Sequence, residues 1–400
     1  MTDVTDQPVA SFPVARRCPY EPPDEYARLR DSEPISRVTI PTGREAWVLT
    51  RHEDVRFMLA DPRFSADRRN PDFPFLVEGQ QESISSFRPN MLSMDAPEHG
   101  PARRGVLGEF TVRRMQALRP RVQAIVDGCL DEILAGPRPA DLVSALALPV
   151  PSLVICELLG VPYADHEFFQ DRASAMLRRT TPTPERVRAA GEIRGYLGDL
   201  ITAKRSDPGD DLLSRQLAKP EPDEHEDLVA TATLLLVAGH ETTANMISLG
   251  TLTLLENPEE LAAIRQDPAR TPAMVEELLR YLTIVETVTS RVATEDVEVG
   301  GTLIRAGEGV IALGHTANHD PGTFPEPDRF DIERGARNHV AFGYGPHQCL
   351  GQNLARLELE IVFDALFRRI PGLRLAAPRA ELPFKDDAVI YGLYSLPVDW

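Results

Sequence analysis

The sequence has little cysteine, no cysteine pair at short spacing and no apolar run long enough to cross a membrane. Its four cysteines stand at positions 18, 129, 156 and 349, so spacings such as C-x-x-C, which zinc and redox sites use, are absent. The longest apolar run, from Leu228 to Gly239, has 12 residues, whereas a membrane span needs about 20. The N-terminus also lacks the apolar core of a signal peptide. These absences predict a cytoplasmic protein without a membrane anchor or structural disulfides.

Positive charge is also scarce. Lys and Arg number 43 against 61 Asp and Glu, which gives a formal net charge of -18 at pH 7. A nucleic-acid-binding protein needs a concentrated basic surface, so this balance argues against a nucleic-acid partner. Proline, in contrast, is abundant, and its 35 residues are scattered along the chain. This distribution indicates many connections between elements and not one disordered tail.

Helical patterns dominate the chain. Apolar residues recur at 3.6-residue spacing over residues 112–135, and the strongest pattern spans 224–256, with Asp223 as its predicted N-cap. Further helical patterns lie at 152–159, 165–178, 185–204, 256–265, 272–282 and 352–369. Two connections lack periodicity, residues 67–93 and 178–185, and each is either a mobile lid or a plain surface loop.

Strand patterns are fewer. Residues 35–50 predict a hairpin around the turn PTGRE, residues 291–314 contain short β-rich runs, and the end of the chain, 388–400, predicts another pair of strands. Length alone would allow two or three domains, but no repeat or low-complexity linker divides the sequence. We therefore predict one domain over residues 1–400, mainly α with a minor β portion, and a helical body at 95–282 and 352–369.

Cys349 has unusual neighbours. Gly343, Gly345 and Gly351 surround it, and an amphipathic helix starting near Leu350 places the sulfur at a helix N-terminus, where N–H groups favour a thiolate. The thiol could be a core residue, half of a zinc or disulfide pair, a nucleophile, or a single thiolate ligand. An axial ligand to haem iron fits a cysteine that is neither paired nor spaced for zinc. Cys129 and Cys156, in contrast, lie in apolar helical patterns and are expected to be core residues.

The strongest helical pattern contains an acid and an alcohol at its centre. Within AGHETTAN, Glu241 and Thr242 follow the small pair Ala238 and Gly239, which predicts a local break in the helix. The pair marks either a solvent-facing turn or a groove over a cofactor with a proton-delivery pair beside it. Farther along, Glu277 and Arg280 share a helix face at i,i+3 spacing and can pair, although such pairs are common on helix surfaces.

The order of these motifs along the chain is more specific than any one of them. An acid–alcohol helix, E-x-x-R, FPEPDRFD with Arg329 and the cysteine loop follow one another. In this the sequence resembles the cytochrome P-450 superfamily over nearly its whole length, and closely resembles the soluble actinobacterial hydroxylases of secondary metabolites and xenobiotics. The resemblance implies the cytochrome P-450 fold, with haem between the long central helix and the cysteine loop.

The resemblance also implies roles for individual residues. Cys349 would be the only protein ligand of the haem iron, and Glu241 with Thr242 would deliver protons during O2 activation. Arg329 would join Glu277 and Arg280 in a structural ion-pair triad behind the haem. Four residues would hold the haem propionates: His99 and Arg103 of an H-x-x-x-R element, Arg291, and His347. Two departures from the family pattern, His319 where Arg is usual and Pro346, touch neither the ligand nor the proton relay.

The function that the resemblance implies is a haem-thiolate monooxygenase. It would use haem b and O2 to hydroxylate or epoxidise a medium-to-large apolar molecule such as a polyketide, a steroid or a xenobiotic. No reductase-like segment or nucleotide fingerprint is present, so electrons from NAD(P)H would reach a monomeric enzyme through a ferredoxin and its reductase. Candidate arginines for that contact are Arg104, Arg113, Arg114 and Arg356. The alternatives are oxidative coupling or ring formation by the same haem chemistry, and a non-catalytic haem-binding sensor.

Five stretches are expected to contact the substrate. They are residues 73–92, residues 174–185, the helix face around Leu235, Ala238 and Thr242, the Ile284–Thr289 connection and the Val389–Ile390 turn. Most of these residues are apolar, which favours an apolar substrate.

Overall fold

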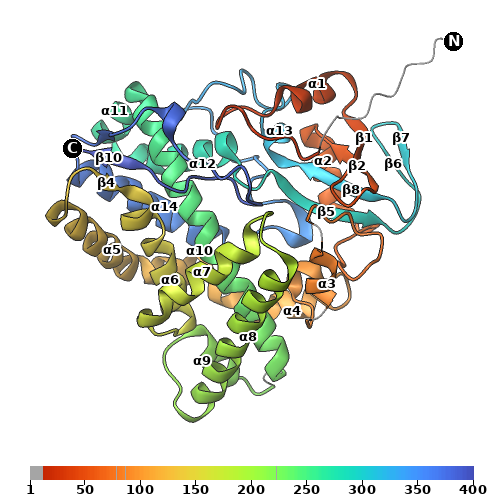
Figure 1. The fold of residues 1–400 in the computed structure, drawn as a ribbon, viewed down its shortest axis with the longest axis horizontal. Coiled ribbons are helices and arrows are strands. Elements are labelled where there is room, and N and C mark those ends of the chain that lie inside the picture. Colours follow the sequence, from red (N-terminus) through yellow and green to blue (C-terminus); the bar gives the residue numbers. More distant parts are fainter. Residues whose placement is uncertain (1–11, 78, 86, 222) are drawn as a thin grey trace.

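The computed structural model describes residues 12–77, 79–85, 87–221 and 223–400 (Figure 1). Its longer helices agree with the periodic segments of the sequence, and short helices fill several of the connections. The α-helices are α1 (Asp24–Ser32), α2 (His52–Ala60), α3 (Gln80–Ser85), α4 (His99–Leu107), α5 (Val112–Ala135), α6 (Pro149–Leu159), α7 (His166–Leu177), α8 (Thr183–Ser206), α9 (Leu212–Leu217), α10 (His225–Glu256), α11 (Pro258–Gln266), α12 (Thr271–Leu282), α13 (Gly314–Asn318) and α14 (Gln352–Arg369).

The β portion is smaller and is collected from distant parts of the chain. The largest sheet has the order β1-β2-β8-β5-β3, from β1 (Ile35–Thr39), β2 (Glu45–Leu49), β8 (Gly309–Leu313), β5 (Thr287–Ala293) and β3 (Phe64–Ser65). Only β2 and β8 pair in parallel; the other pairs are antiparallel. Figure 1 shows this sheet at the opposite side of the molecule from α5 and α6. The mainly α fold with a minor β portion is thus confirmed.

The helix α10 crosses the middle of the molecule (Figure 1). It packs against α6, α8, α12 and α14, and every residue from 243 to 254 is buried. The longest apolar run of the sequence, residues 228–239, lies in the same helix. A helix that packs against other helices on several sides is expected to be apolar over most of its surface. The predicted cap is wrong: α10 begins at His225 after Glu224, which caps without a side-chain hydrogen bond.

The chain end differs from the prediction. Within 388–400 the structure has one strand, β10 (Pro397–Asp399), instead of a pair. Its partners are β4 (Ala140–Asp141) and β9 (Arg374–Leu375), two segments too short for their pattern to show in the sequence. The remaining strands, β6 (Val297–Val299) and β7 (Thr302–Ile304), form a separate hairpin.

The two connections that lack periodicity, residues 67–93 and 178–185, lie against each other. The left-handed φ of Gly79, +69°, places its Cα so close to the start of α8 that an added Cβ would come within 2.2 Å of Thr183 Oγ1. Arg179 N–H, between α7 and α8, donates to Asp387 O at 2.7 Å, so the second connection is also tied to the C-terminal segment. Residues 78 and 86 of the first connection lie outside the described residues. Among the described helices, none combines the length and the apolar character that crossing a membrane requires.

Candidate active site

The loop before α14 holds Cys349 through its backbone. Cys349 N–H donates to Phe342 O at 2.8 Å, a 3-10 turn (Gly345–His347) precedes it, and α14 begins at Gln352. The thiol is therefore at the start of the helix, as predicted. All four cysteines are free, and within the described ranges no three His, Cys, Asp or Glu side chains gather into a metal-binding group. The described residues therefore support neither a disulfide nor a zinc site at Cys349.

The electrostatics of Cys349 oppose a thiolate in the protein alone. Burial raises the pKa of the thiol, and it outweighs the N–H group of Gly351 and the charge of Arg103, which lower it. The helix start does favour the thiolate, as predicted, but burial has the larger effect on the pKa. A metal cation reverses this balance because a coordinated thiol loses its proton. Cys349 thus suits a metal ligand better than an already activated nucleophile.

Only some of the loop glycines are required by the chain itself. Gly345 has a left-handed φ of +71°, and a Cβ there would lie 2.6 Å from Leu59 O in α2. Gly343 also has a positive φ, +69°. At Gly351, no atom of the described chain lies within 4 Å of an added Cβ. Gly345 therefore lets the loop approach α2, whereas no contact within the described residues explains Gly351.

The centre of α10 is continuous, so the predicted break is wrong. Thr242 Oγ1 donates to Ala238 O at 2.8 Å, one turn back, without interrupting the helix. Gly239 has a packing reason instead, because a Cβ there would lie 3.0 Å from Ile155 Cδ1 of α6. Ala238 is exposed and Thr242 half-buried, in a helix otherwise mostly enclosed. One face of α10 is therefore open at the predicted alcohol.

Glu241 is buried beside the alcohol and has its own cation. Lys385 Nζ lies 3.2 Å from Glu241 Oε2, and the two side chains are 10% and 8% exposed. Asn245 Nδ2 donates to Glu241 O at 2.8 Å and reaches Oε2 at 3.4 Å. Lys385 comes from the C-terminal segment. Because 144 residues separate it from Glu241, the sequence does not indicate that the two side chains pair.

The four predicted propionate residues do gather near the cysteine. The rings of His99 and His347 lie 4.1 Å apart, and Arg103 Nη2 donates to Gln348 O, next to Cys349. Arg291 Nη1 donates to Ser290 O at 2.9 Å, whereas its buried Nη2 has no hydrogen-bond partner in the described part of the chain.

These groups repel one another. Burial lowers the pKa of His347 to about 3, and Arg291, His99, Arg103 and also Arg68 lower it further. Burial likewise lowers the pKa of Arg291 to about 10, with a further contribution from Arg68. A bound anion would stabilise the charged forms of these buried basic groups.

The chain provides little negative charge in return. Asp95 is the carboxylate that counteracts the lowered pKa values of His99 and Arg291. Its oxygens already accept hydrogen bonds from Ser65 Oγ and Ala66 N–H. A group with two carboxylates beside Cys349 would complete the cluster, and the two propionates of haem fit this requirement. Arg68 belongs to the cluster but was missed, because nothing distinguishes it in sequence from Arg69.

The ion-pair triad behind this region has a different third member. Arg280 Nε and Nη2 each lie 2.8 Å from the Glu277 carboxylate, and Arg334 Nε lies 3.1 Å from Glu277 Oε1. The prediction of Arg329 is wrong: its side chain is 63% exposed, and its carbonyl accepts from Arg334 Nη2 at 2.8 Å. The turn after α13 exposes the first arginine and directs the second inward.

The departure at His319 has a local explanation. His319 Nδ1 lies 2.8 Å from Asp328 Oδ1, and Nε2 lies 3.0 Å from Tyr281 O. The ring is buried beside the triad and is not part of the basic cluster at Cys349.

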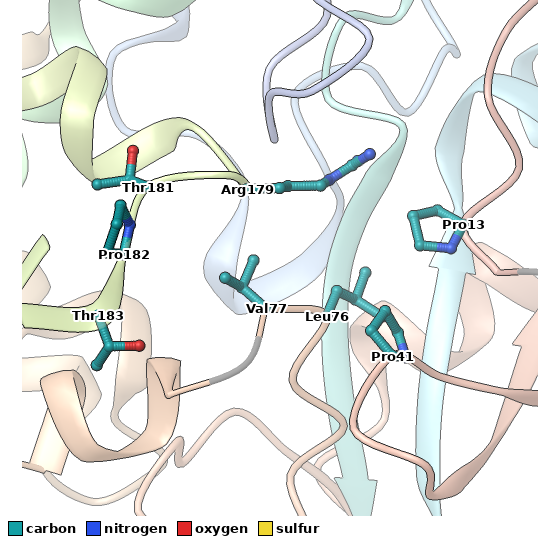
Figure 2. A pocket seen from close by; sticks show the side chains of 8 residues that line it. All are labelled: Pro13, Pro41, Leu76, Val77, Arg179, Thr181, Pro182 and Thr183. Carbon is teal, nitrogen blue, oxygen red and sulfur yellow. The ribbon is translucent and has the colours of Figure 1, made fainter.

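Backbone hydrogen bonds join three of the predicted substrate stretches. Val389 N–H donates to Leu177 O at 2.9 Å, and Tyr391 N–H donates to Ile284 O at 2.9 Å. A pocket of about 370 Å³ lies beside them. Figure 2 shows its lining, which comes from the N-terminal segment, the β1–β2 turn and both connections that lack periodicity. The lining residues are Pro13, Pro41, Leu76, Val77, Arg179, Thr181, Pro182 and Thr183.

Comparison with known proteins gives a consistent result. A family model described as cytochrome P-450 matches residues 187–370. The chain is 51% identical to the vitamin D3 dihydroxylase of Streptomyces griseolus, with all of both chains covered, and 53% identical to the pentalenic acid synthase of Streptomyces avermitilis, with 98% of each covered.

Solved structures agree. The cytochrome P-450 MoxA from Nonomuraea recticatena matches with a TM-score of 0.91 and 57% identity over 98% of both chains. The methyl hydroxylase MycCI from Micromonospora griseorubida, bound to mycinamicin VIII, matches with a TM-score of 0.93 and 42% identity over 98% of this chain and 100% of its own.

Proposed function

The chain belongs to the cytochrome P-450 family, whose members among its relatives are monooxygenases and hydroxylases, and we propose that it hydroxylates or epoxidises a medium-to-large apolar molecule with O2. The observation that carries this proposal is the basic cluster of His99, Arg103, Arg291 and His347 beside Cys349. Its members are short of carboxylate partners among the described residues, and Arg291 Nη2 is buried without a hydrogen bond. This is the charge that haem propionates require next to the thiol that would bind the iron.

Haem, when bound, would supply the activation of O2 and the transfer of one oxygen atom to the substrate. Cys349 would hold the iron as its single protein ligand, and a thiolate donates electron density that favours O–O cleavage. The basic cluster would orient the cofactor by its propionates. The shape of the loop itself is set by Gly345 against α2.

Thr242 and Glu241 would deliver protons. Thr242 Oγ1 is half-buried on the open face of α10, so its hydroxyl can turn from Ala238 O toward a bound ligand. Glu241 is the neighbouring acid, and its Oε2 lies 3.2 Å from Lys385 Nζ. A carboxyl group at this position can take up a proton and pass it on. The two side chains thus form a short path from the interior ion pair to the open face.

We propose that electrons reach the haem from a separate ferredoxin, which its reductase reduces with NAD(P)H. Arg104 and Arg113 are exposed and available to an acidic partner. Arg114 is also exposed, and its Nη2 lies 3.8 Å from Glu109 Oε1. Arg356 is less available, because it pairs with the Glu276 carboxylate, at 3.0 Å from Nη2, and stacks on Phe342 at 4.6 Å. Charge reversal in Arg113→Glu should therefore weaken the salt dependence of haem reduction more than Arg356→Glu.

The proposal names a class of substrate and not one molecule. Relatives are named for vitamin D3, pentalenic acid and mycinamicin VIII, which are three different molecules, so family membership selects none of them. The apolar residues that supply most of the lining of the pocket in Figure 2 support an apolar molecule.

The test combines a spectrum with labelled oxygen. Reduced, carbon-monoxide-treated protein should show the thiolate-haem band, Cys349→Ala should lose it, and the half-buried control Cys18→Ala should keep it. With ferredoxin, reductase and 18O2, the product should carry one labelled atom. A product without label indicates oxidative coupling, and NAD(P)H consumption without any product indicates a sensor; either result contradicts the proposal.

A further inference from the structure

The pocket of about 370 Å³ in Figure 2 has one charged side chain among apolar and hydroxyl-bearing ones. Three prolines, Leu76 and Val77 supply most of the apolar surface, and Arg179 extends across one edge toward Pro13. The volume falls within the range of small-molecule sites, which typically pair an apolar lining with a few polar groups. The pocket therefore has the composition of a site for an apolar molecule with one polar end.

The backbone holds Arg179 in place. Its N–H donates to Asp387 O at 2.7 Å, and the preceding residue, Arg178, forms an antiparallel bridge with Ala388. These contacts fix where the side chain leaves the chain. The guanidinium position therefore does not depend on a side-chain partner.

The guanidinium of Arg179 lacks a matched anion. Its Nε is buried and has no hydrogen-bond partner among the described residues. Burial lowers the pKa of Arg179, while Glu286 acts in the opposite direction, so a closer anion would stabilise the cation.

The nearest acids do not bind the guanidinium directly. Glu286 Oε2 lies 3.8 Å from Arg16 Nε, and its Oε1 is buried without a hydrogen-bond partner among the described residues. The Asp387 carboxylate accepts from Tyr394 Oη at 2.6 Å and from Thr180 Oγ1 at 3.3 Å. A guanidinium has five N–H donors in a planar fork that suits a carboxylate, and those of Arg179 are not used by these acids.

We propose that this pocket binds the carboxylate of an otherwise apolar substrate, with Arg179 as the anion-binding residue. The inference rests on the proposed function, since the ligand is the enzyme's substrate. It narrows the substrate class from apolar molecules in general to apolar carboxylic acids. The location supports it, because Leu76, Val77, Thr181 and Thr183 belong to the two connections expected to contact the substrate.

The experiment uses haem-loaded protein and two matched probes, dodecanoate and dodecanamide, which differ only at the polar end. Isothermal titration calorimetry gives both dissociation constants without any turnover. We expect the wild type to bind dodecanoate about tenfold more tightly than dodecanamide, as for one charge-assisted contact. Arg179→Gln should reduce this preference to about one, with the affinity for dodecanamide unchanged.

The control is the adjacent arginine. Arg178 is exposed and stacks on Tyr394 at 4.9 Å, so Arg178→Gln should keep the tenfold preference. Arg179→Lys retains the charge and should keep most of it, which covers a failure of Arg179→Gln to fold. Equal affinities of the wild type for both probes, no binding of dodecanoate, or a preference that persists in Arg179→Gln would each overturn the inference. The proposed function fails separately, through the carbon-monoxide spectrum and the labelled product.

Discussion

Lys385 Nζ lies 3.2 Å from Glu241 Oε2, and this ion pair joins the C-terminal segment to the centre of α10. The approach depends on Gly392, because a Cβ there would lie 1.9 Å from Asn245 Oδ1. Lys385 N–H also donates to Gly392 O at 2.9 Å. The acid proposed for proton delivery is therefore held by a segment that a C-terminal turn presses against the helix.

Removing the cation should destabilise the protein. In Lys385→Met the Glu241 carboxylate stays buried without an ion pair, so we expect the free energy of unfolding to fall by about 3 kcal/mol in urea denaturation. Adding Glu241→Gln should recover much of this loss, because neither charge then remains. As a control, Lys219→Met removes a half-buried Nζ that donates to Gly105 O, and it should cost about 1 kcal/mol. A Lys385→Met protein as stable as the wild type would contradict this account.

The hydroxyl of Thr242 should control how completely electrons are used for product. We expect Thr242→Ala to lower product formed per NAD(P)H by about tenfold and to raise hydrogen peroxide, because a proton donor is lost. Thr242→Ser retains the hydroxyl and should stay close to the wild type. Product and peroxide are measured in the same reaction. Unchanged ratios in Thr242→Ala would remove the threonine from proton delivery.

The corrected triad gives a matched pair of variants. Arg334→Ala leaves part of the buried Glu277 carboxylate unpaired, so we expect a loss of about 3 kcal/mol in the free energy of unfolding. Arg329 is largely exposed, and Arg329→Ala should change it by less than about 0.5 kcal/mol. Urea denaturation of both variants measures the two losses. A larger loss in Arg329→Ala than in Arg334→Ala would support Arg329 as the third member of the triad, as predicted from the sequence.

Gly345 and Gly351 should respond differently to alanine. In haem-free protein, Gly345→Ala combines a left-handed φ with a Cβ 2.6 Å from Leu59 O, and we expect it to lower the free energy of unfolding by at least about 2 kcal/mol. Gly351→Ala meets no atom of the described chain and should be nearly neutral. If Gly351→Ala then weakens haem uptake, measured by absorbance, the glycine makes room for the cofactor. If haem-free Gly351→Ala is instead destabilised, the glycine is needed for packing within the protein itself.

His315 should make the protein sensitive to acid. Its ring is fully buried, and burial, then Arg16 and His319, lower its pKa well below 6.5. The unfolded chain then binds a proton that the folded chain does not, so this contribution to stability is complete above pH 6.5 and is lost as the pH falls below it.

The variant His315→Gln removes that titration. The free energy of unfolding of both proteins is measured at pH 7.5 and at pH 5.5, and the decrease should be about 1.4 kcal/mol smaller in His315→Gln than in the wild type. This is the energy of one titrating group over roughly one pH unit below its pKa in the unfolded chain. Thr316→Ser, which alters the same buried turn without removing an ionisable group, should retain the wild-type dependence. Equal pH dependence in His315→Gln and the wild type would contradict the assignment.

Local patterns in the sequence determined most helices and the cysteine loop. Residues 112–135 and 352–369 form helices with the predicted bounds, because apolar spacing along one face depends only on neighbours a few residues away. The pairing of Glu277 with Arg280 was equally accessible, since both lie on one helix turn. That His99 and His347 lie near Cys349 followed from the resemblance that the order of the motifs carried, and their roles toward a cofactor stay predictions.

Only the tertiary structure determined which charged residues pair when they are far apart in the sequence. The sequence could not distinguish Arg334 from Arg329, because which arginine turns inward depends on a loop folding over α12. Nor could it pair Lys385 with Glu241, since a buried charge finds its counter-ion across the packed interior and not along the chain. Periodicity is a local property of the chain, whereas charge compensation and close backbone approach are properties of the folded interior.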